Sequence, residues 1–114
     1  MAKIDGDVLR GHLETMVLSV VQANEGHGYE ILRRLELLGG GALELKEGTL
    51  YPLLYRLETA GLLHARWESG SSERRGPRRR LYRTTEAGKR ELKRRRVLWR
   101  EFVAVVGPIV EAAT

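Results

Sequence analysis

The sequence predicts a mainly α-helical domain of the α+β class that carries one small β-hairpin, and three observations lead to that expectation. Apolar residues recur at steps of three and four in four segments of the 114-residue chain, as a buried helix face requires. Two short runs that alternate apolar and polar residues flank a loop rich in Gly, Ser, Arg and Pro. Glycines follow the second and third helical segments, where they favour a helix end. The length fits one domain with one core.

Three helices are expected before the hairpin. The first covers residues 8–23, where leucines, valines and a methionine form an apolar stripe. The second follows Gly28 and ends at the three glycines of residues 39–41. The third begins close to Thr49, because Pro52 has no amide hydrogen and fits only near the first turn of a helix.

The remaining elements are short strands and one long helix. Residues 42–45 alternate apolar and polar side chains over the length of one short strand. Residues 63–67 and 79–83 form the two strands of the hairpin, and the residues between them form its tip. A long last helix follows, capped by Thr84 or Thr85.

This order of elements is that of a winged helix-turn-helix, in which the hairpin is the wing. We expect residues 1–83 to form the winged helix-turn-helix DNA-binding domain. Residues 84–114 are expected to form a C-terminal dimerisation helix that packs with this domain as one structural unit.

Basic residues are concentrated in one stretch of the chain. Residues 74–100 carry 13 basic and 2 acidic side chains, whereas the whole chain has a formal net charge of +5. Such a stretch is typical of a protein that binds a polyanion, and nucleic acid is the commonest polyanion in a cytoplasm. For residues 89–96 a solvated helix face explains the charge equally well. We therefore expect double-stranded DNA as a partner.

Four segments in register carry a specific resemblance to a known family. They are residues 28–31 (GYEI), 47–58 (EGTLYPLLYRLE), 61–63 (GLL) and 80–88 (RLYRTTEAG). In these segments the sequence resembles the PadR family of transcriptional regulators, in its short form with a single dimerising helix after the wing. His27 and Lys46 depart from the residues common in the family, which bears on the operator rather than on the fold. The resemblance implies a sequence-specific homodimeric repressor of a palindromic operator, released by a small ligand.

Ten residues are expected to contact DNA. The amino-terminal end of the third helix reaches base edges and phosphates in the major groove, and wing arginines lie along phosphates or enter a minor groove. The ten are Tyr29, Lys46, Thr49, Tyr51, Arg56, Arg74, Arg75, Arg78, Arg79 and Arg80. Alternatives are helix capping for Thr49, partial packing in the core for Tyr51 and solvated charge for the loop arginines. For Tyr55 packing in the core is the favoured interpretation.

The last helix carries more apolar surface than one small domain covers, which predicts a two-fold dimer. The residues expected at the dimer interface are Leu9, Leu92, Trp99, Phe102, Val103, Val106 and Val110. The arginines of residues 94–96 are expected to face outward, and Pro108 to end or kink the helix.

Trp99 has two explanations at the sequence level. Its indole face suits stacking of flat aromatic molecules, and the resemblance implies a small aromatic or hydrophobic effector at the matching position in some members of the family. Simple packing between two subunits is the favoured alternative, since a tryptophan on a dimer seam needs no ligand.

Enzymatic and metal-binding functions are not indicated. His12, His27 and His64 lie in separate elements, the chain has no cysteine, and no serine lies beside a buried base. The glycines of residues 39–41 lack the Lys and Ser or Thr of a phosphate-binding loop. We therefore expect no catalysis, no cofactor and no metal.

The location expected from the sequence is cytoplasmic and nucleoid-associated. No apolar run is long enough to span a bilayer, and the amino terminus lacks the apolar stretch of a secretory signal, so no membrane partner is expected. Two other functions stay open: a chromosome-coating protein without sequence preference, and a winged-helix module that binds other proteins.

Overall fold

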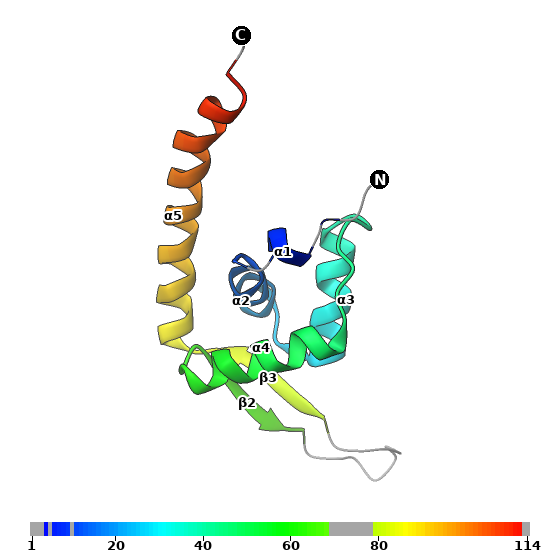
Figure 1. The fold of residues 1–114 in the computed structure, drawn as a ribbon. Coiled ribbons are helices and arrows are strands. Elements are labelled where there is room, and N and C mark those ends of the chain that lie inside the picture. The colour runs from blue at the N-terminus through cyan, green and yellow to red at the C-terminus, as the bar shows by residue number, and fades with distance from the viewer. Residues whose placement is uncertain (1–3, 5, 10, 69–78, 113–114) are drawn as a thin grey trace.

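The computed structural model describes residues 4, 6–9, 11–68 and 79–112, and Figure 1 shows their arrangement. The elements in chain order are α1 (Gly6–Leu9), α2 (Leu13–Ala23), β1 (Gly26–His27), α3 (Gly28–Leu38), α4 (Glu47–Thr59), β2 (Leu63–Trp67), β3 (Arg80–Thr84) and α5 (Glu86–Val110). Helices α2, α3 and α4 pack around the core, β2 and β3 project below α4, and α5 runs up one side (Figure 1). The predicted fold class, with its helix-turn-helix, wing and long last helix, is confirmed.

The sheet has three antiparallel strands in the order β1-β3-β2, and its third strand is not where the sequence pattern placed it. Gly26 pairs with Tyr82 of β3, whereas residues 42–45 form no strand. In that segment Leu43 is buried and the carbonyl of Ala42 accepts a hydrogen bond from the amide of Ile4 at 2.9 Å. The alternation of apolar and polar residues in this segment therefore reflects the burial of Leu43 in a loop. Such burial does not require pairing with a strand.

The first predicted helix is interrupted, which corrects the expectation of one helix over residues 8–23. Gly11 and His12 form a turn between α1 and α2, and the His12 amide donates to the carbonyl of Leu9 at 2.8 Å. Glycine is a poor helix former, and the apolar periodicity of residues 8–23 continues across the turn, so periodicity alone did not reveal it. The turn sets α1 and α2 apart as two helices (Figure 1).

Helix α4 begins two residues earlier than predicted. Lys46 is its N-cap residue in an extended conformation, and Pro52 is the sixth residue rather than part of the first turn. Pro52 is exposed and has no amide hydrogen to donate to the carbonyl four residues back, at the exposed Gly48. The predicted end is confirmed, since Gly61 follows the helix with φ +77°, a conformation that glycine adopts without strain.

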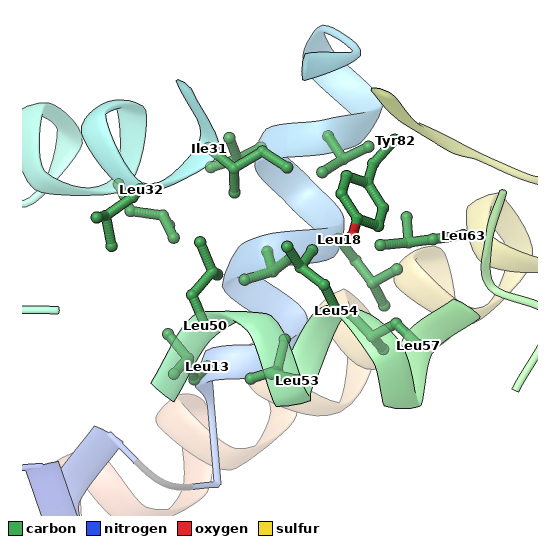
Figure 2. Close-up of a cluster of buried hydrophobic side chains, with 14 of the residues drawn as sticks. Leu13, Leu18, Ile31, Leu32, Leu50, Leu53, Leu54, Leu57, Leu63 and Tyr82 are labelled. Atoms are coloured by element: carbon green, nitrogen blue, oxygen red, sulfur yellow. The ribbon is translucent and has the colours of Figure 1, made fainter. Parts of the chain in front are cut away.

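The core is built mainly of leucines contributed by every long element. Figure 2 shows these side chains meeting around α2, with Tyr82 closing one side. The largest fully buried side chains are Val17, Leu18, Ile31, Leu50, Leu54, Leu57, Leu63 and Leu92. Full burial of one such side chain stabilises the fold by about 1.5–3 kcal/mol, so this cluster holds α4 in place against α2 and α3.

Helix α5 contacts the domain through its amino-terminal half. Thr85 caps it, because its hydroxyl oxygen accepts a hydrogen bond from the Gly88 amide at 2.9 Å. Within α5 only Gly88 and Leu92 are buried. The part of α5 beyond the contact of Trp99 with His12 extends past the domain as a free-standing rod (Figure 1). It ends at Val110, two residues after Pro108, close to the predicted end.

Candidate nucleic-acid interface

The outer face of α4 is open along its whole length. Its four leucines, at positions 50, 53, 54 and 57, face the core, and residues on a helix are about 100° apart. The side opposite them is therefore formed by Gly48, Pro52, Tyr55 and Thr59, all of which are exposed. Tyr55 is 66% exposed, so the favoured interpretation of this residue as core packing was wrong. Its hydroxyl and ring are available to a partner on the outer face.

Tyr51 joins the two helices of the helix-turn-helix. Its ring lies directly over Gly28, where an added Cβ would come within 2.6 Å of the Tyr51 Cε1 atom. Tyr51 is still 44% exposed, and Tyr29, the second residue of α3, is 58% exposed. The fold thus brings two predicted DNA-contacting tyrosines, 22 positions apart in the chain, to one junction between α3 and α4.

The amino-terminal end of α4 is exposed as predicted. Lys46 and Thr49 are both exposed, and the amide of Thr49 donates to the carbonyl of Lys46 at 3.0 Å. Thr49 is the third residue of the helix and does not cap it, which removes the capping alternative. Gly48 has nothing within 4 Å of its missing Cβ, so a phosphate can approach the backbone of the first turn closely.

Arg56 lies on the flank of α4 that faces α2. Its Nε atom is 3.8 Å from Glu14 on α2, and Arg95 of α5 lies 3.5 Å from the other oxygen of the same carboxylate. The Arg56 side chain remains 61% exposed, so the carboxylate leaves most of it accessible.

Arg80 is half-buried and paired with a carboxylate of α4. Its Nη2 atom donates to Glu58 of α4 at 2.8 Å, and its guanidinium lies 5.4 Å from the ring centre of Trp67 on β2. The side chains of Arg80 and Glu58 are only 34% and 27% exposed. Arg80 therefore links the wing to α4 and is a poor candidate for a phosphate contact. The sequence offered no signal for this pair, which is separated by 22 positions.

Arg79 marks the point where the described wing ends. Its side chain is 53% exposed and its Nη2 atom is 3.6 Å from Glu68. Arg74, Arg75 and Arg78, the other arginines predicted to contact DNA, lie outside the described residues.

The arginines of residues 94–96 do not all face outward, which corrects that expectation. Arg95 contacts both Glu91 and Glu14, and Arg96 donates to the hydroxyl of Ser19 at 3.0 Å. Two arginine hydrogen bonds lower the pKa of the Glu91 carboxyl to about 2. Two of the 13 basic side chains of this stretch, Arg95 and Arg96, thus connect α5 to α2.

The predicted dimer residues fall into two groups. Leu92 is fully buried and Leu9 is 9% exposed, so both already belong to the interior of the protomer and offer a partner almost no surface. The exposed apolar side chains of α5 begin beyond Leu92. They are Val97, Leu98, Trp99, Phe102, Val103, Val105, Ile109 and Val110, each between 44% and 75% exposed, with Val106 half-buried beside them.

A groove of about 850 Å³ lies between α2 and α5. Trp99 and Phe102 form one wall with rings stacked at 6.2 Å, and the edge of His12 meets Trp99 at 5.3 Å. Met16 and the arginines of residues 94–96 also line it. Glu14 lines it too, and Arg94 and Arg95 are paired with carboxylates, so the groove combines a flat aromatic wall with ion-paired arginines.

Features of other protein classes are not found in the described parts of the chain. No group of three or more His, Cys, Asp or Glu residues among them is placed to hold a metal ion. None of the described helices has the length and apolarity that crossing a membrane requires.

Comparisons with known proteins agree with this geometry. The model of the family described as transcriptional regulator PadR-like matches residues 17–94. A PadR family transcriptional regulator from Eggerthella lenta DSM 2243 has a crystal structure with 34% identity and a TM-score of 0.80, over 94% of this chain and 88% of that chain. A transcriptional regulator from Clostridium thermocellum gives 28% identity and a TM-score of 0.82, over 93% and 100%. An uncharacterised protein of Lysinibacillus sphaericus is 29% identical over 108 residues, 95% of this chain and 96% of that protein.

Proposed function

We propose, from the premise that this chain belongs to the transcriptional regulator PadR-like family, that it represses transcription as a homodimer on a palindromic operator and responds to a small ligand. The family is one of DNA-binding regulators rather than enzymes, so DNA binding and the regulation of transcription are its general function. The operator, the dimer and the ligand are the parts that this proposal adds.

The observation that carries the proposal is the exposed outer face of α4, with the wing beside it. A helix held by its leucines against the core presents its other side to the major groove, which admits one α-helix. Tyr55 is exposed on that side, Thr49 is exposed in the first turn at its edge, and Lys46 precedes the helix. Hydroxyl groups bond to base edges or phosphates, and the ring of Pro52 offers an apolar contact of the kind that thymine methyl groups accept.

The homodimer is supported by the free-standing part of α5. Eight large apolar side chains between Val97 and Val110 are exposed, and soluble monomers seldom leave such a continuous apolar surface open to water. A second copy offers the same face, and a two-fold axis lets each α5 cover the other. Dimer formation would place two α4 helices on one side of the duplex, about 34 Å apart.

The ligand response is supported by the groove between α2 and α5. Trp99 and Phe102 offer stacked rings, and Arg94 lies on the same wall, so a flat aromatic compound fits its chemistry. A Trp67→Phe variant leaves Trp99 as the single indole reporter. Compounds that release DNA should change Trp99 emission, and an effector that releases DNA without any such change would exclude Trp99 from the ligand site.

The proposal is tested by selecting bound fragments from a pool of random duplex DNA and measuring competition by unselected DNA. A regulator should recover an inverted repeat and prefer it by about 10³-fold or more. Recovery without any consensus, with equal affinity for selected and unselected duplexes, would favour a chromosome-coating protein. Failure to retain any duplex at modest salt would favour a module that binds proteins.

A further inference from the structure

His27 occupies an unusual position between two carboxylates. Its Nδ1 atom contacts Glu30 on α3, and its Nε2 atom lies 3.0 Å from Glu68, which follows β2. The imidazole is only 12% exposed. Both ring nitrogens therefore face negatively charged oxygens in a half-enclosed site.

The protonation state of the ring decides whether both contacts are attractive. A neutral imidazole has one N–H and one lone pair, so it donates to one carboxylate and turns a lone pair toward the other. An imidazolium donates from both nitrogens, and hydrogen bonds between charged partners are roughly twice as strong as neutral ones. From the positions that its two nitrogens occupy, only the imidazolium donates to both carboxylates.

The other charged groups around the cluster balance its acidic side. Arg34 lies 3.7 Å from the second oxygen of Glu30, and Arg79 lies 3.6 Å from Glu68. The backbone amide of His27 also donates to Glu30, and this bond is the main reason that the pKa of the Glu30 carboxyl is lowered. Glu25 in the turn before β1 is paired with Arg66 of β2 at 3.5 Å. Each carboxylate of the cluster therefore has an arginine beside it as well as the imidazole ring.

The cluster joins two parts of the predicted interface. His27 is the N-cap of α3, immediately before Gly28 and the exposed Tyr29. The amide of Glu68 donates to the carbonyl of Arg79 at 2.8 Å, so Glu68 belongs to the last described pair at the base of the wing. The chain then continues into the arginines of residues 74–78. A bond from His27 to Glu68 thus fixes the ends of β2 and β3 relative to α3.

We infer that His27, as an imidazolium, is a positioning residue that holds the wing against α3, and that DNA binding by this protein is therefore coupled to the uptake of one proton per protomer. Loss of that proton leaves one N–H for two carboxylates, so the ring no longer makes attractive contacts with Glu30 and Glu68 together, and its hold on the ends of β2 and β3 weakens. Histidine is the side chain that titrates between about pH 5 and pH 8, so the coupling acts near neutrality. DNA affinity should therefore fall as the pH rises and the ring loses its proton.

A DNA-free experiment tests the bond itself. In a Trp99→Phe variant, Trp67 is the single tryptophan and directly precedes Glu68. Its emission should change with a one-proton transition between about pH 6 and pH 8. The transition should vanish in Trp99→Phe proteins that also carry His27→Gln or Glu68→Gln. It should persist with His64→Gln, because His64 is exposed on the same strand. A flat profile with His27 present, or an unchanged transition in Glu68→Gln, would overturn the inference.

A binding experiment then tests the coupling to DNA. The dissociation constant of the unaltered protein for a labelled mixed-sequence duplex of about 30 base pairs should rise about tenfold from pH 6 to pH 8, the factor expected for one charge-assisted bond. Glu68→Gln keeps the titrating ring and the α3 cap, yet should reduce this change to about twofold or less. A full pH effect in Glu68→Gln would show that the charge of His27 acts on DNA directly, against the inference. If no DNA binds at any pH, the function proposed above fails, while the Trp67 titration still decides whether the bond exists.

Discussion

Replacement of Gly28 by alanine is expected to disturb the junction of the helix-turn-helix through one specific contact. An added Cβ would lie 2.6 Å from Cε1 of Tyr51 and 2.7 Å from both its Cζ and its hydroxyl oxygen. Carbon atoms in good contact are about 3.5–4.0 Å apart, so the overlap is about 1 Å at several atoms. Gly28 is buried at the first position of α3, which leaves Tyr51 as the group that must move.

The size of the effect follows from two opposing terms. Overfilling a packed site costs about 1–3 kcal/mol, and replacing glycine by alanine in a helix returns up to about 1 kcal/mol. Gly28→Ala should therefore lower the free energy of unfolding by about 1–2 kcal/mol, or the melting temperature by about 4–8 °C. Displacement of Tyr51 from the α3–α4 junction should also weaken DNA binding about five- to tenfold.

A double-mutant cycle separates this mechanism from a general loss of stability. Thermal unfolding followed by circular dichroism would be measured for Gly28→Ala in the original chain and in a Tyr51→Ala background. Without the ring the alanine meets no obstacle, so its cost should disappear or become a gain of up to about 1 kcal/mol. An equal cost in both backgrounds would refute the contact argument, and a normal DNA affinity for Gly28→Ala would refute the role of Tyr51.

Three further predictions concern α5, the wing and acid stability. Gly88→Ala should lower the free energy of unfolding by about 2–4 kcal/mol, because its Cβ would lie 2.1 Å from the carbonyl oxygen of Leu62. Gly107→Ala in the same helix is the control, since its Cβ meets nothing within 4 Å, and it should be neutral or stabilising when both are measured by urea unfolding. Reversing either charge of the pair, by Glu58→Arg or by Arg80→Glu, should weaken DNA binding, because the pair aligns the wing with α4. The double variant should recover most of the lost affinity, and a double variant that binds no better than the single ones would count against this alignment. The pKa of Glu91 is lowered to about 2, so its contribution to stability is present above pH 4.5 and declines as the pH falls toward 2. Glu91→Gln should therefore make the melting temperature less dependent on pH in that range.

Local patterns in the sequence were sufficient for most of the architecture. Apolar periodicity and helix-ending glycines placed α3 and α4 to within a few residues, and alternation placed β2 and β3. The turn at Gly11 was missed because the apolar periodicity continues across it, although the His12 amide bonds locally to the carbonyl of Leu9. The strand β1 was missed because it depends on a distant partner, Tyr82, more than fifty positions away.

The functional residues likewise divide into those that local patterns predicted and those that depend on contacts between distant elements. Exposure at the start of α4 was predictable from helix geometry, and Lys46, Thr49 and Tyr51 lie where expected. Ion pairs between elements were not predictable, so Arg80 was grouped with solvent-facing arginines although Glu58 and the Trp67 ring hold it. Tyr55 was misplaced because its neighbours in sequence are core leucines, while its own angle on the helix points away from them.

The measurement that tests the central claim most directly is the affinity of the protein for its selected duplex when half a helical turn, about 5 base pairs, is inserted between the two half-sites. Two rigidly paired α4 helices cannot reach half-sites that are rotated to opposite sides of the duplex, so the affinity should fall by about a hundredfold or more. Insertion of a full turn should also give a low affinity, because the half-sites are then too far apart for the rigid pair. Equal affinity for the original and the half-turn duplexes would contradict recognition by a two-fold dimer.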